Sequence, residues 1–174
     1  ALWDRSERTL VLARDRIGEK PLYYGWQGDT FLFGSELKAL SAHPAFRREV
    51  DRDAVALLLR HNGIPAPHSI WRGIGKLPPG TWLTVSARTR DAAPKAYWSL
   101  KEVAEAGQRT RFDGDIDAAS LELEQVLGEA VAGQMLADVP LGALLSGGID
   151  SSSIVALMQA RSPWPVRTLS IGFH

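Results

Sequence analysis

Residues 146–151, which read Ser-Gly-Gly-Ile-Asp-Ser, have the types and spacing of an anion-binding loop. They follow the short apolar segment 141–145 and lead into helix-like sequence from residue 153 to about residue 161. Two adjacent glycines allow backbone angles that other residues rarely adopt, so successive N–H groups can converge on one oxyanion. The unpaired N–H groups and the positive dipole end of the following helix point to the same place. Ser151 and Ser152 can cap that helix or donate hydroxyls to the anion.

The loop contains no lysine, and the sequence has no Gly-Lys-Ser or Gly-Lys-Thr, which excludes the phosphate loop of kinases and GTPases. The charge of a bound phosphate must then be neutralised by a metal ion or by basic residues elsewhere. Asp150 is the natural metal contact, because hard divalent cations prefer carboxylate oxygens. The alternative interpretation is a Gly-Ser turn at a strand end, which many α/β proteins contain and which binds nothing.

Residues 146–151 resemble the pyrophosphate loop of the N-type ATP pyrophosphatases, which cleave ATP to AMP and pyrophosphate while adenylating a carboxylate or carbonyl. Residues 137–142, Ala-Asp-Val-Pro-Leu-Gly, resemble one branch of that group, the glutamine-hydrolysing asparagine synthases. The resemblance implies ATP and Mg as cofactors, with Asp150 as the magnesium contact. It assigns ATP and pyrophosphate binding to Leu144, Ser146, Gly147, Gly148, Asp150, Ser151 and Ile171, the last of these beside the adenine.

Three N-terminal segments, residues 14–24, 33–40 and 76–80, resemble the later part of the glutaminase domain of the same enzymes. The implied fold class is α+β followed by α/β. It comprises a partial N-terminal-nucleophile hydrolase (αββα) glutaminase-like region and then the first β-α-β unit of a Rossmann-like ATP pyrophosphatase domain. We place the later part of the glutaminase type 2-like domain, with its linker, at residues 1–110. The start of the asparagine synthetase domain is placed at residues 111–174.

Alternating apolar residues and turn signals predict the elements of the first region. Strands are expected at 1–4, 9–15, 21–26, 30–35 and 81–86, with a hairpin around Gln27-Gly28-Asp29 and a turn at 74–80. Helices are expected at 36–42 and at 51–60, the second with Val55, Leu58 and Leu59 on one side. Segment 64–71 is expected to be extended. Arg14-Asp15 and Ser35-Glu36 are interpreted as buried or turn-stabilising polar pairs rather than catalysts.

The same signals predict the elements that hold the loop. The polar stretch 87–111 is expected to be a linker, and residues 116–137 a helix whose N-terminus is favoured by Asp113, Asp115 and Asp117. Its buried face is expected to comprise Leu123, Val126, Leu127, Ala130, Val131 and Leu136. A strand at 166–173 would complete one crossover of a parallel sheet, with ligand at the C-terminal ends of the strands. A calcium loop from Asp113 is excluded, because Ala118 stands where such a loop requires glycine.

Composition excludes several classes of function. Twenty basic and twenty acidic residues cancel without any charged block, which argues against nucleic acid or an anionic membrane as partner. No apolar run approaches the roughly 18 residues of a membrane span. The sequence has no cysteine, which fits a reducing cytoplasm. The four histidines, His43, His61, His68 and His174, lack metal-ligand spacing.

The resemblance also indicates what the sequence does not contain. In that family an N-terminal cysteine hydrolyses glutamine, and the ammonia attacks a β-aspartyl-AMP formed from aspartate and ATP. This sequence begins at Ala1 and has no cysteine, so we interpret it as a piece of a longer protein without the nucleophile. It is expected to carry no catalytic residue and to be inactive alone. The implied partners are ATP, aspartate and glutamine, and a homodimer is left open.

The expected enzyme is a carbon–nitrogen ligase with glutamine as amido donor, in asparagine biosynthesis. Three alternatives stay open. Relatives that close β-lactams or macrolactams use the same loop and the same adenylation. A nucleotide-binding regulatory module would bind ATP without turning it over. A scaffold fragment would retain the loop as a structural relic.

Overall fold

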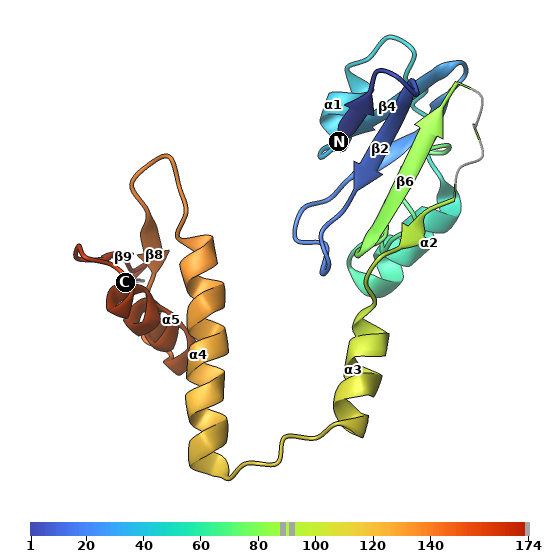
Figure 1. Ribbon diagram of the computed structural model, residues 1–174. Helices are drawn as coiled ribbons and strands as arrows, with labels where there is room; N and C mark the ends of the chain where they lie inside the picture. The colour runs from blue at the N-terminus through green and yellow to red at the C-terminus, as the bar shows by residue number, and fades with distance from the viewer. Residues whose placement is uncertain (88–89, 91–92, 173–174) are drawn as a thin grey trace. The chain divides into compact units, whose positions relative to one another are not determined.

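The computed structural model describes residues 1–87, 90 and 93–172, and the chain divides into two compact units (Figure 1). Unit 1 comprises Ala1–Arg109 and unit 2 comprises Thr110–His174. Unit 1 contains antiparallel sheets with helices, whereas unit 2 contains a parallel strand pair with two helices. The chain is therefore a mixed α and β protein.

One sheet of unit 1 has the strand order β1-β2-β6-β7, and all its pairs are antiparallel. Its strands are β1 (Leu2–Asp4), β2 (Thr9–Ala13), β6 (Thr81–Ser86) and β7 (Lys95–Ala96). Side chains along β6 alternate between buried and half-buried, as expected for a strand with one covered face. The first, second and sixth strands confirm the predicted strands at 1–4, 9–15 and 81–86.

The second sheet of unit 1 has the order β4-β3-β5. The hairpin of β3 (Tyr23–Gln27) and β4 (Thr30–Gly34) confirms the predicted pair. Gly28 takes the first position of its two-residue turn with φ of +65°, which favours glycine. The third strand, β5 (Gly75–Lys76), pairs with Tyr23 and Tyr24. The prediction of a simple turn over 74–80 was therefore wrong in part, because two residues are too short to show a strand period.

The main core of unit 1 lies between the two sheets. Leu12 and Leu83 from the first sheet are buried against Leu77, which directly follows β5. Half-buried side chains of β3 and β4, including Trp26 and Phe31, pack on this cluster. A second cluster of Leu32, Leu40 and Ile74 covers the other face of the second sheet, where α1 (Leu37–Ser41) packs.

The helix α2 (Arg52–His61) was predicted correctly in position but not in orientation. Asp51 caps its N-terminus by accepting hydrogen bonds from the N–H groups of Asp53 and Ala54. Ala54 is the buried residue of this helix, whereas Leu59 is 82% exposed and Leu58 is also exposed. The predicted apolar side is thus mostly uncovered, and the buried position of α2 is Ala54 instead.

The predicted linker at 87–111 contains regular structure. Within its described part, β7 pairs with β6, and α3 (Leu100–Arg109) forms a helix of ten residues. None of the residues of α3 is buried, so its polar composition gave no signal of a packed element. The segment at 64–71 forms no regular strand, and Trp71 makes one isolated bridge to Val50.

Unit 2 contains α4 (Ile116–Gln134), β8 (Gly142–Leu144), α5 (Ile149–Ala160) and β9 (Arg167–Leu169). Asp115 caps α4, as the acidic residues before it predict. β8 and β9 pair in parallel, with Leu144 opposite Leu169, and α5 connects them. This confirms the strand–loop–helix–strand order. Phe173, the last residue of the predicted second strand, lies outside the described residues.

The predicted buried face of α4 was largely wrong. Gly128 and Val131 are its buried residues, whereas Leu123, Val126 and Leu136 are exposed, Leu136 by 88%. α4 packs against α5, the other helix described in unit 2, so only one narrow stripe of the α4 surface is covered (Figure 1). Among the described residues, no helix combines the length and apolarity needed to cross a membrane.

Candidate functional site

The Ser146–Ser151 loop leaves β8 at Leu145, whose backbone is held at both polar atoms. The Leu145 N–H donates to the carbonyl oxygen of Leu169 at 2.8 Å, which extends the β8–β9 ladder by one step. The Leu145 carbonyl accepts a hydrogen bond of 2.7 Å from the Ser170 hydroxyl. The loop therefore starts from a fixed point at the C-terminal edge of the parallel pair.

The two loop glycines have different roles. Gly147 has φ of +84°, a left-handed conformation that favours glycine, whereas Gly148 has an ordinary φ of −79°. A Cβ at Gly147 would meet no atom within 4 Å, so this side of the loop is open. The left-handed turn at Gly147 lets the chain reverse into α5 and leaves space beside the glycine backbone.

α5 starts at Ile149, four residues earlier than predicted, with Gly148 as its N-cap. The expected capping by Ser151 and Ser152 is wrong, because both lie inside the first turns and donate their hydroxyls to the Gly148 carbonyl at 3.1 and 2.8 Å. No side chain caps the helix. Its first N–H groups are therefore left without a side-chain partner and are available to an anion, as in other helix N-termini that bind phosphate.

The two ends of the loop are joined by serines. The hydroxyls of Ser146 and Ser151 lie 3.0 Å apart, and the Ser146 N–H donates to the Ser151 hydroxyl at 3.4 Å. Of the residues predicted to bind ATP, Ser146, Gly147, Gly148, Asp150 and Ser151 thus lie in one turn between β8 and α5. Leu144 is the last residue of β8, and Ile171 lies two residues beyond the end of β9. The two residues are 71% and 77% exposed.

Asp150 is the only acidic residue in the first turn of α5. Groups of three or more potential metal-ligating side chains do not occur among the described residues. Mg²⁺ fits such a site nonetheless, because proteins often bind it through one or two carboxylates and the substrate phosphates. The donor set therefore suits a metal that arrives with a nucleotide and does not suit a structural metal.

The Arg14-Asp15 pair has the structural role that the sequence predicts. The Arg14 guanidinium donates to the carbonyl oxygens of Lys20, Leu77 and Gly18 at 2.7–2.8 Å. The Asp15 carboxylate accepts the N–H groups of Gly18 and Glu19. The Glu19 bond is the main reason that the pKa of Asp15 lies below its ordinary value. All these bonds stabilise the turn at 15–20.

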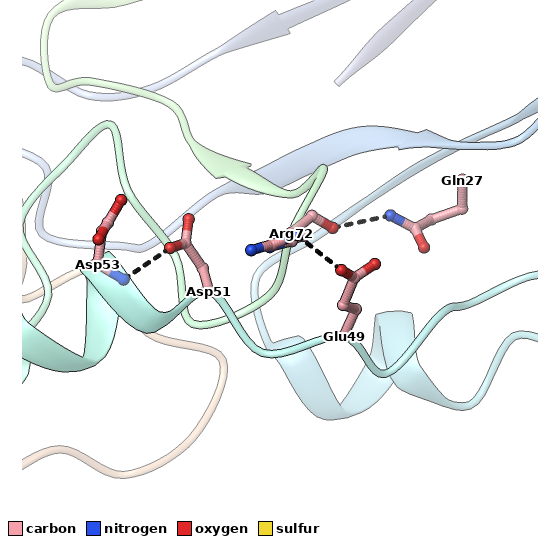
Figure 2. A network of polar contacts seen from close by, with 5 residues as sticks. All are labelled: Gln27, Glu49, Asp51, Asp53 and Arg72. Atoms are coloured by element: carbon pink, nitrogen blue, oxygen red, sulfur yellow. Dashed lines mark hydrogen bonds and ion pairs between the residues drawn. The ribbon is translucent and has the colours of Figure 1, made fainter.

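A polar network around Gln27 and Arg72 is the other conspicuous constellation of unit 1 (Figure 2). The buried Gln27 amide donates to the Arg72 carbonyl and accepts from the Arg47 N–H, at 3.2 and 2.8 Å. Arg72 also pairs with Glu49 at 2.8 Å. Both ends of the Gln27 amide are satisfied by backbone groups, which indicates a role in holding the loop before β5 and not in catalysis.

Ser170 is the residue that the sequence interpretation missed. It directly precedes Ile171, which the sequence assigned to the nucleotide, and was itself given no role. The available signal was a hydroxyl residue directly after the strand that pairs with β8. Its contact with Leu145 could not be predicted without the register in which β8 and β9 pair.

Comparison with protein families finds two matches on this chain. Residues 1–98 match the glutamine amidotransferase domain, and residues 122–174 match asparagine synthase. The first match covers more than half of the 174 residues.

Individual relatives agree with this order. Asparagine synthetase 3 (glutamine-hydrolysing) of Bacillus subtilis is 32% identical over 179 residues, which cover 100% of this chain and 28% of that protein. A Methanocaldococcus jannaschii protein, provisionally named glutamine-hydrolysing asparagine synthetase 2, is 34% identical over 99% of this chain and 33% of its own length. Amidase chry2 of Gibberella zeae is 31% identical over 90% of this chain and 22% of its own length.

The chain thus spans a third or less of the length of these relatives. Its two family matches follow one another in a single chain, as the loop and the N-terminal segments indicate. The chain belongs to the glutamine-hydrolysing asparagine synthetase family, with a glutamine amidotransferase domain followed by the start of an asparagine synthase domain.

Proposed function

We propose that this chain is part of a glutamine-dependent asparagine synthase. The enzyme would adenylate aspartate with ATP to β-aspartyl-AMP and release asparagine when glutamine-derived ammonia attacks it. The observation that carries this proposal is the Ser146–Ser151 loop, which joins a parallel strand to an uncapped helix through a left-handed Gly147. Such a loop presents converging N–H groups to phosphate oxygens.

In this proposal unit 2 holds the nucleotide. The N–H groups of Gly147 and Gly148 and the hydroxyls of Ser146 and Ser151 would bind the pyrophosphate oxygens. Leu144 and Ile171 would contact the adenosine part, since Leu144 is the last residue of β8 and Ile171 follows the last residue of β9 by two positions. Asp150 would hold Mg²⁺, which would neutralise the phosphate charge that no lysine in the loop can balance.

Unit 1 would be the later part of an αββα N-terminal-nucleophile glutaminase. Its two face-to-face sheets with α1 on one outer face support this architecture. With residues 1–110 in this role, residues 111–174 would begin a Rossmann-like ATP pyrophosphatase domain. The chain has no cysteine and so cannot supply the glutaminase nucleophile itself. We place the reaction in the cytoplasm, where ATP and both amino acids are available.

The test is ATP–pyrophosphate exchange by the full-length protein that carries this sequence, with aspartate as the carboxylate. The proposal predicts exchange that depends on aspartate and falls by about 100-fold or more in Asp150→Ala, because a metal contact contributes several kcal/mol in the transition state. Asp117→Ala is the matched control, since Asp117 occupies the first turn of α4 as Asp150 does that of α5. It should leave exchange unchanged.

The same assay separates the alternatives. Exchange with another carboxylate but not with aspartate would indicate a lactam-forming or other amide-forming relative. ATP binding without any exchange would indicate a regulatory module. Absence of both binding and exchange would contradict the proposal and favour a structural relic.

A further inference from the structure

Leu145, the residue at the base of the loop, is held by two consecutive residues of another strand. Its N–H donates to Leu169 and its carbonyl accepts from the Ser170 side chain, at 2.8 and 2.7 Å. The regular β8–β9 ladder ends one residue earlier, at the Leu144–Leu169 pair. The second of these two bonds is therefore made by a side chain at the point where backbone pairing stops.

Because a side-chain hydroxyl and not a backbone N–H donates to the Leu145 carbonyl, the chain can turn away from the sheet at this point. A continued ladder would keep both chains extended, and neither could turn. With the Ser170 hydroxyl as donor, the chain after β9 can leave the sheet while Leu145 stays fixed. The left-handed turn at Gly147 then begins only two residues beyond a fixed carbonyl.

The loop has a second attachment on its other side. The Ser151 hydroxyl, from the first turn of α5, lies 3.0 Å from the Ser146 hydroxyl and accepts the Ser146 N–H. Leu145 and Ser146 are thus fixed from β9 and from α5 respectively. Ser151 belongs to the loop motif itself, whereas Ser170 lies nineteen positions farther along the chain.

We infer that Ser170 is a positioning residue for the pyrophosphate loop. Its bond to the Leu145 carbonyl holds the N–H groups of Gly147 and Gly148 in the place where they meet phosphate. This inference rests on the proposed function of the loop. Ser170 acts through Leu145, and no contact with the ligand is required of it. An anion site made of backbone N–H groups depends on preorganisation, because each group contributes only when it points at the ligand.

The inference is tested by measuring the affinity of the 174-residue chain for Mg·pyrophosphate in wild type and three variants, from NMR amide shifts during titration. Ser170→Ala removes the hydroxyl and should weaken binding by about three- to tenfold, the range of one exposed hydrogen bond. Ser170→Thr keeps the hydroxyl and suits the end of a strand, so it should restore affinity to within about twofold.

Ser162→Ala is the matched control. The Ser162 hydroxyl donates to the Trp164 carbonyl at 2.8 Å, an equivalent bond in the same unit but before β9, away from the loop. This variant should bind as tightly as wild type. The thermal midpoint of unfolding should be the same in all four proteins, because a purely structural role would lower it together with the affinity.

Three results would each overturn the inference. They are unchanged affinity in Ser170→Ala, equal losses of affinity in Ser170→Ala and Ser162→Ala, and failure of Ser170→Thr to restore binding. Wild-type chain that does not bind Mg·pyrophosphate would overturn the proposed loop function instead, and the inference with it. The two failures are distinguished by the wild-type titration alone.

Discussion

At the scale of single residues, Asp15 has a structural role within its own turn. Its carboxylate accepts three N–H groups within its own turn, from Gly18, Glu19 and Lys20. The neighbouring Arg14 donates to three carbonyl oxygens. Gly80 donates to the Asp15 carbonyl, and the Tyr97 hydroxyl donates to the Arg14 carbonyl at 2.6 Å. The pair therefore joins the 15–20 turn to the segments on either side of β6.

The substitution Asp15→Asn tests how much the charge of the Asp15 carboxylate stabilises the fold, through the pH dependence of the unfolding temperature. Hydrogen bonds, first the one from Glu19, lower the pKa of the Asp15 carboxyl in the folded state. A carboxyl with a lowered folded-state pKa stabilises the protein above its unfolded pKa of about 4, and this contribution is lost as pH falls through the folded pKa. Wild type should therefore unfold at a higher temperature than Asp15→Asn at pH 6.

That advantage should shrink below about pH 4, where wild-type Asp15 takes up its proton and becomes similar to asparagine. The measurement is the thermal midpoint of both proteins at several pH values between 2.5 and 7, on the order of six points. All other carboxyls are shared, so the difference reports on Asp15. A difference that stays constant over this range would contradict the pKa assignment.

At the scale of elements, local signals predicted where the strands and helices lie but not which faces they bury. The Gln27–Thr30 hairpin and the Asp51 and Asp115 caps depend on neighbouring residues only, so the sequence contained them. The covered stripe of a helix depends on what packs against it. For this reason Leu59 and Leu136 were assigned to buried faces and are exposed.

The loop itself was predicted in place and composition, because Gly147, Gly148 and the serines form a contiguous motif. The early start of α5 was not predicted, since three serines in a row are poor helix formers. The hydroxyls of Ser151 and Ser152 instead donate to the Gly148 carbonyl, which the sequence pattern did not reveal. The α3 helix was missed because none of its residues is buried, so its polar composition gave no signal of a packed element.

The packing of α4 on α5 gives a test at this scale. Gly133 in α4 has open space where a Cβ would lie, whereas a Cβ at Gly128 would overlap the Arg161 guanidinium at the end of α5. Gly133→Ala should raise the free energy of unfolding by up to about 1 kcal/mol, the usual gain for alanine in a helix. Gly128→Ala should gain less or be destabilising.

Arg161→Ala provides the control for that comparison. In its background, Gly128→Ala should recover the gain seen at Gly133, because the overlapping side chain is gone. Chemical denaturation of the four variants would measure these differences. Equal effects of Gly128→Ala with and without Arg161 would contradict the packing of this arginine on α4.

At the scale of the whole molecule, the two units differ in how much apolar surface they bury. The fully buried side chains Leu12, Leu77 and Leu83 all belong to unit 1. In the described part of unit 2, Val131 and Met158 are the buried apolar side chains, and Leu141, Ile149 and Trp164 are exposed. Burial of apolar area is the main stabilising contribution in folding, so unit 2 should be the less stable of the two.

The Bacillus subtilis and Methanocaldococcus jannaschii relatives are three or more times longer than this chain, and their names combine glutamine hydrolysis with asparagine synthesis. This chain carries regions of both domains, and the proposed nucleotide loop lies wholly within unit 2. The proposed nucleotide site can therefore be tested in the chain as it stands.

The most direct measurement is an NMR titration of the isotopically labelled 174-residue chain with Mg·ATP. If the loop binds the nucleotide, amide shifts are expected at Gly147, Gly148 and Asp150. A further shift is expected at Ile171 that Mg·pyrophosphate does not produce, and Asp150→Ala should remove the Mg²⁺ dependence. A chain whose loop amides do not respond to Mg·ATP at millimolar concentration, while unit 2 retains dispersed resonances, would contradict nucleotide binding by the loop.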